Sequence, residues 1–157
     1  LMDTLGNAGY EHYEISNFCR PGMYSRHNTS YWKGIPYLGC GPSAHSFNTD
    51  AREWNISSLE DYIHSIENNH RRFENEYLDR TTRYNECIMT SIRTKRGLSL
   101  NDLEREFGKG LWQYCMNMAR PHLDSGKLEI RDSHLCLTRK GIFVSDSIMS
   151  DLMFIED

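Results

Sequence analysis

The clearest hydrophobic pattern lies in the second half of the chain, where apolar residues recur at the three- and four-residue spacing of amphipathic helices. The first of these helices is expected to begin at a cap on Thr81 or Thr82 and to stop at Gly97. The residues expected on its buried face are Tyr84, Ile88, Met89 and Ile92. The spacing therefore predicts a helix with one apolar side.

Two more helices are predicted after Gly97. Ser99 is expected to start one that ends at Gly108, and the other runs over about residues 111–125 and is closed by Gly126. Pro121 should bend or break the latter, because its nitrogen cannot donate to a carbonyl one turn earlier. The side chains expected to face inward are Leu100, Leu103 and Phe107, followed by Leu111, Tyr114, Cys115, Met118 and Leu123.

The end of the chain alternates like a β-hairpin and then returns to a helical pattern. Residues 131–134 form the polar turn between two strands. The inward strand residues are Leu128, Ile130, Leu135 and Leu137. Thr138 is expected to cap one last helix that bears Ile142, Val144, Ile148 and Leu152. The order helix, helix, helix, hairpin, helix predicts a winged-helix-like domain.

The first half of the chain has shorter patterns. Leu1, Met2 and Leu5 indicate the end of an amphipathic helix, so the chain is expected to be a piece of a longer protein. Residues 12–16 alternate like a short strand, and a long ordered loop leads from them to a glycine-rich passage at residues 37–47. Loops of this length inside a compact domain are usually functional.

A polar passage follows at residues 48–55. Ser58 then caps a helix that ends near Asn68. Its buried stripe is expected to be Leu59, Tyr62, Ile63 and Ile66. Residues 69–80 are highly charged and have no clear period, which indicates a domain boundary. The sequence therefore predicts two domains, residues 1–78 and residues 79–157.

Charge excludes some classes of partner. The chain carries 18 Lys and Arg against 22 Asp and Glu, a net charge of −4, which gives no broad attraction to nucleic acid or anionic membranes. Residues 79–157 hold twelve cations and twelve anions, and Arg120 is the one cation in the helix that would enter a DNA groove. DNA binding is disfavoured, because phosphate neutralisation drives DNA affinity. Without a signal peptide or an apolar run near ~18 residues, a cytoplasmic protein is expected.

The cysteines do not form a metal motif. All five lie at least 21 residues from one another, so no C-x-x-C pair or C-x-x-x-C-x-x-C triplet can hold zinc or an iron–sulfur cluster. The odd count also argues against a disulfide framework, and reduced, mostly packed thiols are expected.

One candidate for chemistry is the string H-N-x-x-Y-W at residues 27–32. In a helical turn His27 falls beside Tyr31, and Asn28 falls beside Trp32. An imidazole next to large aromatics suits a flat, hydrophobic, iron-containing ring, which needs an axial nitrogen and faces to stack on. A packed aromatic cluster whose histidine bonds to the backbone is the other interpretation, and the residues alone leave both open.

A second candidate is the glycine-rich loop that contains Gly41, Ser43, Ala44 and His45. Glycines allow a ligand or a neighbouring strand to approach the backbone closely. The loop matches neither G-x-G-x-x-G nor a P-loop, so His45 could equally be a hydrogen-bonded core histidine. The polar residues of the preceding strand, His12, Glu14 and Asn17, are expected to face substrate, as strand ends do in barrel enzymes.

These strings carry a family resemblance. Residues 9–18 (GYEHYEISNF), 25–32 (S-R-H-N-x-x-Y-W) and 34–47 (G-x-P-Y-L-G-x-G-x-S-A-H-S-F) resemble the later part of the oxygen-independent coproporphyrinogen III oxidase family of radical S-adenosylmethionine (SAM) proteins. They are most similar to its haem-chaperone branch. R-x-x-x-G-L at residues 93–98 and L-T-x-x-G at residues 137–141 are similar to the family's C-terminal helical domain.

The resemblance implies a fold and a set of cofactors. Such proteins have a partial (β/α) barrel that holds a [4Fe–4S] cluster and SAM, followed by the helical domain. An α+β chain is therefore expected, with residues 1–78 as the last strands and helices of the barrel and residues 79–157 as the C-terminal domain. The cluster motif and the G-G-x-P SAM motif are not present here, so this chain is not expected to perform radical chemistry by itself.

The resemblance also implies site residues and partners. His27 becomes the candidate haem-iron ligand, and the residues around it are Asn28, Tyr31 and Trp32. The loop residues Gly41, Ser43, Ala44 and His45 are expected on the SAM side. The preferred interpretation is a haem chaperone that binds haem and passes it to an acceptor protein. The alternatives are oxidative decarboxylation of coproporphyrinogen III, with a porphyrinogen as substrate, and a protein-docking or nucleic-acid module.

Overall fold

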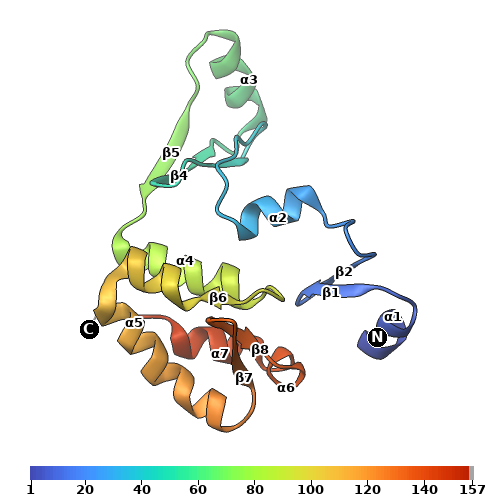
Figure 1. Cartoon of the computed structure of the whole chain (residues 1–157). Helices are drawn as coiled ribbons and strands as arrows, with labels where there is room; N and C mark the ends of the chain where they lie inside the picture. The colour runs from blue at the N-terminus through green and yellow to red at the C-terminus, as the bar shows by residue number, and fades with distance from the viewer. Residues whose placement is uncertain (156–157) are drawn as a thin grey trace. The chain divides into compact units, whose positions relative to one another are not determined.

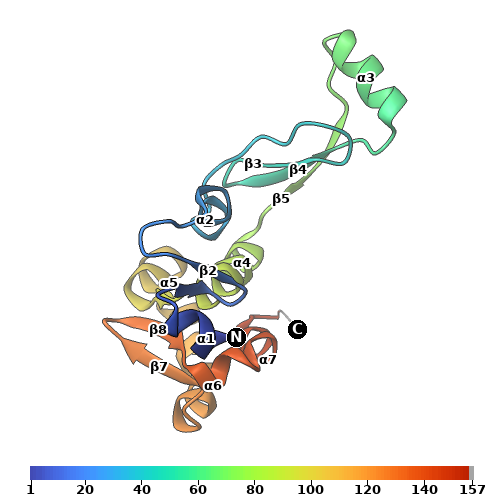
Figure 2. The same cartoon turned by 90° about the vertical axis from the view of Figure 1, so that its right-hand side faces the viewer.

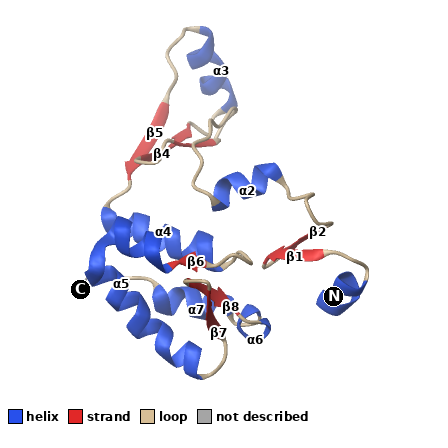
Figure 3. Cartoon of the chain, in the orientation of Figure 1, coloured by secondary structure: helices blue, strands red, loops and turns tan. Residues whose placement is uncertain are grey.

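Residues 1–155 are described by a computed structural model, and their contacts form two units. The first unit combines residues 1–33 with residues from 80 onward, and the second comprises residues 34–79. Helices and strands are mixed in both units, as Figures 1 and 3 show, which agrees with the predicted α+β class. No helix within residues 1–155 has both the length and the apolar composition needed to cross a membrane.

The helix α4 (Arg80–Ile92) supplies the centre of the first unit. Tyr84, Ile88 and Ile92 are completely buried on its apolar face, as predicted. Met89 is 42% exposed, so its placement on that face was wrong, because each residue is turned by about 100° from the one before it in an α-helix. The helix also ends before Gly97, which instead belongs to the turn that follows.

The two helices predicted after Gly97 are both present and together carry the label α5 (Leu100–Asp124), with a kink between them at Gly108. Ser99 caps it as predicted, because its Oγ accepts from the amide of Asp102 at 3.2 Å. Gly108, with φ of 71°, interrupts the helix. Pro121 does not end it, since a proline in the last turns removes only one helical hydrogen bond. Met118, expected to face inward, is 37% exposed.

The predicted hairpin consists of β7 (Leu128–Arg131) and β8 (His134–Leu137). Asp132 and Ser133 connect the strands with φ of 48° and 60°, the two positive values of a type I′ turn. A short strand, β6 (Leu98–Ser99), pairs with the other edge of β8, so the sheet order is β6-β8-β7. Ile130, expected inward, is 49% exposed on the outer strand.

Two helices close the chain where one was predicted. Thr138 caps α6 (Arg139–Ile142), and α7 (Ser145–Leu152) begins after a break. The break falls at Val144, which has φ of −130° and is 41% exposed, so its expected inward position was wrong. Figure 2 shows α6 and α7 beside the hairpin. The core of this unit comprises Tyr84, Ile88, Ile92, Leu98, Leu100, Leu103, Phe107, Cys115, Ala119, Leu128, Leu135, Ile148, Met149 and Leu152.

The N-terminal residues of the first unit form α1 (Met2–Asn7), a hairpin of β1 (Glu11–Glu14) and β2 (Asn17–Cys19), and α2 (Arg26–Trp32). The single strand predicted at residues 12–16 is thus the start of this hairpin. Its backbone is bound to the turn after α4, because the Ile15 amide donates to the Arg93 carbonyl and the Lys95 amide donates to the Tyr13 carbonyl, both at 3.0 Å.

The second unit is an antiparallel sheet with one helix. Its strands β3 (His45–Phe47), β4 (Ala51–Asn55) and β5 (Phe73–Tyr77) lie in that order, and α3 (Leu59–Glu67) connects the last two. Sequence patterns missed β4 and β5, because both strands are polar and are held by backbone pairing between distant residues. The predicted buried stripe of α3 is largely exposed: Leu59 is 60%, Ile63 46% and Ile66 44% exposed.

Candidate functional site

A buried carboxylate joins the N-terminal hairpin to the end of α4. Glu14 is 2% exposed, and its Oε1 accepts from Nε of Arg93 at 2.6 Å. Its Oε2 accepts from the amide and hydroxyl of Ser16 at 3.1 and 3.0 Å and from the side chain of Asn17. Burial acts to raise the pKa of Glu14, but hydrogen bonds from Asn17, Arg93 and Ser16 outweigh it and the pKa is lowered. Glu14 is therefore a structural anion.

The polar residues of this strand, which were expected to face substrate, contact other groups of the protein. Glu14 and Asn17 bond to each other. His12 stacks on Phe18, with ring centroids 4.1 Å apart, and its Nε2 lies 2.8 Å from the Ile15 carbonyl oxygen. These side chains thus bond within their own hairpin, and Glu14 bonds to Arg93 as well.

Arg93 connects this buried anion to the aromatic motif. Its guanidinium carbon lies 4.6 Å from the centre of the Trp32 ring, a cation–π contact. Trp32 is half-buried on α2, and its Nε1 is buried with no hydrogen-bond partner within residues 1–155. The series Glu14, Arg93, Trp32 thus fixes the last turn of α2 to the rest of the first unit.

The helix α2 divides the H-N-x-x-Y-W motif between two faces. The hydroxyl of Ser25 caps the helix by accepting from the Asn28 amide at 3.3 Å. His27 and Tyr31 lie together, with ring centroids 5.0 Å apart and planes at 87°. His27 is exposed and makes no hydrogen bond to residues 1–155, Tyr31 is 39% exposed and Asn28 is half-buried. The imidazole nitrogens are therefore accessible from outside.

The R-x-x-x-G-L string at residues 93–98 has a physical explanation. Arg93 pairs with Glu14. Gly97 has φ of 79°, and a Cβ on it would lie 2.4 Å from the Leu135 carbonyl oxygen, so no side chain fits there. Leu98 is 1% exposed in the core. The string therefore joins the N-terminal hairpin, strand β8 and the core within six residues.

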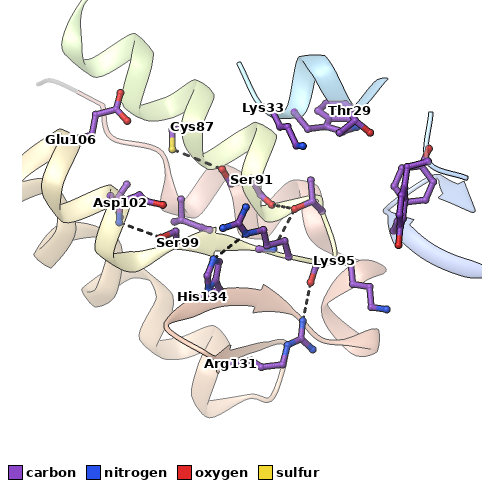
Figure 4. Close-up of a pocket in the computed structure, with 18 of the residues that line it drawn as sticks. Thr29, Lys33, Cys87, Ser91, Lys95, Ser99, Asp102, Glu106, Arg131 and His134 are labelled. Atoms are coloured by element: carbon purple, nitrogen blue, oxygen red, sulfur yellow. Dashed lines mark hydrogen bonds between the residues drawn. The ribbon is translucent and has the colours of Figure 1, made fainter. Parts of the chain in front are cut away.

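A pocket of about 870 Å³ lies in the first unit beside α2 and the turn after α4. Tyr13, Tyr24 and Trp32 supply its aromatic lining, and the Tyr13 and Tyr24 rings meet edge-on with centroids 5.3 Å apart. Its cationic lining consists of Lys33, Lys95, Arg96 and Arg131. Figure 4 shows Lys33 at the C-terminal end of α2 and Lys95, Arg131 and His134 on the other side of the pocket. Sequence patterns missed this pocket, because its residues come from segments far apart in the chain.

The glycine-rich loop of the second unit is held by a buried amide of β4. Asn55 is 2% exposed and donates from Nδ2 to the carbonyl of Gly39 at 3.2 Å and that of Gly41 at 2.8 Å. A Cβ on Gly39 would lie 2.2 Å from the His45 carbonyl oxygen. At Gly39 the loop backbone is therefore closely packed against the start of β3, and Asn55 of β4 holds it there.

The four residues predicted for the SAM side lie in this loop and at the start of β3. Gly41, Ser43 and Ala44 belong to the loop, where Ser43 has φ of 58°. His45 is exposed, and its ring centroid lies 5.9 Å from that of Trp54, its partner across the sheet. All four belong to the second unit, whereas H-N-x-x-Y-W belongs to the first.

The cysteines are free thiols, and Cys19, Cys115 and Cys136 are buried. Burial raises the pKa of Cys115 to about 11 and that of Cys87 to about 11, so both remain protonated at neutral pH. Among residues 1–155 no group of three or more His, Cys, Asp or Glu side chains could hold a metal ion.

Comparisons with known proteins agree with the family resemblance of the sequence motifs. The family described as "HemN C-terminal domain" matches residues 78–144. The chain is 30% identical over 158 residues to "Heme chaperone HemW" of Mycobacterium tuberculosis (strain CDC 1551 / Oshkosh), covering 98% of this chain and 38% of that protein. It is 25% identical to "Heme chaperone HemW" of Bacillus subtilis (strain 168), covering 94% of this chain and 39% of the relative.

The fold has a counterpart among solved structures. The structure of coproporphyrinogen III oxidase (HemN) from Escherichia coli, described as a radical SAM enzyme, matches with a TM-score of 0.71 at 17% identity, over 97% of this chain and 39% of that one. The chain belongs to the haem-related radical SAM family that these proteins represent. Within that family it corresponds to the C-terminal part of the HemW-like haem chaperones and oxygen-independent coproporphyrinogen III oxidases, and it spans less than two fifths of the length of these relatives.

Proposed function

We propose that this chain supplies the haem-binding helix of a haem chaperone, which passes haem to an acceptor protein. The observation that carries the proposal is the exposed imidazole of His27, which has the Tyr31 ring beside it and no competing hydrogen bond within residues 1–155. An axial nitrogen and an adjacent aromatic surface are what a haem requires. The relatives named heme chaperones support the same reading.

The residues around His27 fit a bound haem. Ser25 caps α2, and Trp32 is held by Arg93, so the helix that carries His27 is fixed at both ends. A preformed helix loses little conformational freedom when the ligand binds, which favours affinity. Haem is the cargo in this proposal, with His27 as its iron ligand and Asn28, Tyr31 and Trp32 as its surroundings.

We also propose the wider organisation that the family implies. The order of α4, the two parts of α5, the β7–β8 hairpin and α6–α7 supports a winged-helix-like domain over residues 79–157. Residues 1–78 would then be the last part of a partial barrel in a cytoplasmic protein that carries SAM and a [4Fe–4S] cluster elsewhere. The open space beside Gly41, whose φ is 107°, supports the assignment of Gly41, Ser43, Ala44 and His45 to the SAM side, because a ligand can approach the backbone there.

Oxidative decarboxylation of coproporphyrinogen III is the second candidate. The fold it shares with the Escherichia coli oxidase favours it. A porphyrinogen has no iron, however, and would not use the accessible nitrogen of His27. The H-N-x-x-Y-W motif therefore favours the chaperone.

Titration of the chain with haem tests the proposal. The parent should give a Soret band, and His27→Ala should raise the Kd about tenfold or more, which corresponds to ~1.4 kcal/mol. Trp32→Ala should weaken binding less, because the axial nitrogen remains. His64→Ala is the matched control, since His64 is another exposed helical histidine. An unchanged Kd and spectrum in His27→Ala would refute the proposal.

A further inference from the structure

We propose that the pocket beside α2 binds the carboxylate edge of a tetrapyrrole, with Lys33 and Arg96 contacting its two propionates. This inference rests on the proposed function, since it concerns the same class of cargo. The pocket volume of about 870 Å³ falls within the roughly 300–1,000 Å³ of small-molecule sites. Trp32 lines the pocket and also belongs to the H-N-x-x-Y-W motif, so the two features share a helix.

The acidic residues that line the pocket are already neutralised. Glu106 pairs with Arg83 at 3.1 Å and Asp102 pairs with Arg105 at 2.6 Å, and neither arginine lines the pocket. Glu11 accepts from Lys95 at 2.9 Å. The carboxylates therefore compete little with an anionic ligand for the remaining cations.

Of the four cations in the lining, two have an ion-pair partner within residues 1–155 and two do not. Arg131 pairs with Glu129 at 3.2 Å, and Lys95 pairs with Glu11. Lys33 and Arg96 form no ion pair with any carboxylate within residues 1–155, although the charge of Arg96 contributes to the lowered pKa of Asp102. Two unpaired cations in one pocket match the two carboxylates of a protoporphyrin.

Arg96 is also oriented. Its Nε donates to Nε2 of His134 at 3.4 Å, and Nδ1 of His134 lies 2.8 Å from the carbonyl oxygen of Asp132. This arrangement places the proton of His134 on Nδ1 and its lone pair on Nε2. The two terminal nitrogens of Arg96 have no partner within residues 1–155, and together they have the geometry for a bidentate bond to one carboxylate.

The aromatic lining suits the flat part of such a ligand. Tyr13 and Tyr24 meet edge-on, and the Tyr24 hydroxyl donates to Glu11 at 2.6 Å, which fixes its ring. Leu98 and Leu103 also line the pocket, although each is only 1% exposed. Aromatic and aliphatic surface next to two unpaired cations is complementary to a tetrapyrrole with carboxylates at one edge.

Metal-free protoporphyrin IX tests the pocket separately from the iron site, because it cannot use an axial ligand. Fluorescence titration of the chain should show binding that is about tenfold weaker, or more, when Lys33→Ala and Arg96→Ala are combined. Lys109→Ala combined with Arg120→Ala is the matched control, since both are exposed cations of α5 outside the pocket. The control should bind like the parent.

Two further titrations separate the possible outcomes. The first is the haem titration of His27→Ala described above. In the second, the dimethyl ester of protoporphyrin IX should bind the parent and the double variant equally. If His27→Ala weakens haem but the double variant binds protoporphyrin IX like the parent, the proposed function stands and this inference is wrong. The inference is also overturned if the parent binds no protoporphyrin IX. It is likewise overturned if replacing Lys33 and Arg96 weakens the binding of an acidic peptide but not that of protoporphyrin IX.

Discussion

At the scale of single residues, the sequence strings that resemble the family include positions where the structure allows only one type of residue. Gly97 is an example, because both its positive φ and the nearby Leu135 carbonyl exclude a side chain. Glu14 and Arg93 are another, because each is needed to satisfy the other at a junction between segments 79 residues apart. Because their partners are distant in the chain, the structural role of such residues cannot be derived from the sequence, where they can be recognised only as part of a family motif.

Replacement of Gly97 by alanine should destabilise the chain. The left-handed conformation alone costs an L-residue about 1–2 kcal/mol, and a Cβ 2.4 Å from the Leu135 carbonyl oxygen forces β6 and β8 apart. We expect a loss of at least about 2 kcal/mol in urea unfolding. Gly110→Ala is the control, because Gly110 has open space within 4 Å and lies in a helix, where alanine should be neutral or stabilising. Equal stability of the two variants would contradict the argument.

The Glu14–Arg93 pair should make stability depend on pH. The folded-state pKa of Glu14 is lowered from the ordinary value of 4.5, so its contribution is present above that value and is lost as the pH falls through the lower, folded-state pKa. Glu14→Gln should reduce stability at pH 7 by roughly 3–5 kcal/mol, since it leaves Arg93 without its anion at a largely buried site. Its unfolding free energy should also decline less than that of the parent below about pH 4.5.

Arg83→Ala is the control for the Glu14 prediction. Arg83 lies on the same helix and pairs with Glu106, but both side chains are more than 40% exposed, and such pairs contribute about 0–1 kcal/mol. Its pH profile should follow that of the parent. If the profile of Glu14→Gln also followed the parent, Glu14 would not be the group that titrates.

At the scale of elements, local patterns predicted what local interactions stabilise. The apolar faces of α4 and of the first part of α5, the cap at Ser99 and the β7–β8 turn were all predictable, because each depends on residues within a few positions of one another. Strands β4 and β5 were not predictable, because their polar sequences gain stability from pairing with residues far along the chain. The same reason explains why a contiguous motif on α2 was found, whereas the pocket beside it was not.

The exposure of α3 shows the limit of a helical pattern. Leu59, Ile63 and Ile66 have the spacing of a buried stripe, and Ser58 caps the helix as predicted, because its hydroxyl accepts from the Asp61 amide at 3.3 Å. The pattern therefore identified the helix and its cap correctly. Burial, however, is a property of what packs against a helix, and the spacing of its own residues does not contain that information.

At the scale of the whole molecule, the two units differ in how much core they contain. The first unit buries a cluster of large apolar side chains around Tyr84, Ile88 and Leu135, each at 0% exposure. In the second unit the buried side chains are mostly small or polar: Ser46, Ala51, Asn55, Ser65 and Leu78. Since apolar burial is the main stabilising contribution to folding, the first unit should resist local unfolding more strongly.

Hydrogen exchange of backbone amides can test this difference in stability. It can also test whether residues 1–33 fold together with the rest of the first unit. Amides of α4 and β8 should exchange at least about tenfold more slowly than those of α3 and β5, because protected amides lie in elements with buried apolar contacts. The Ile15 amide, which donates to the Arg93 carbonyl, should be protected together with α4. If it exchanged as fast as the amides of α3 while α4 stayed protected, residues 79–157 would be the independent folding unit that the sequence predicts, and the N-terminal hairpin would be only loosely attached to it. Equal protection of α3 and α4 would instead show that the second unit resists local unfolding as strongly as the first, despite its smaller apolar core.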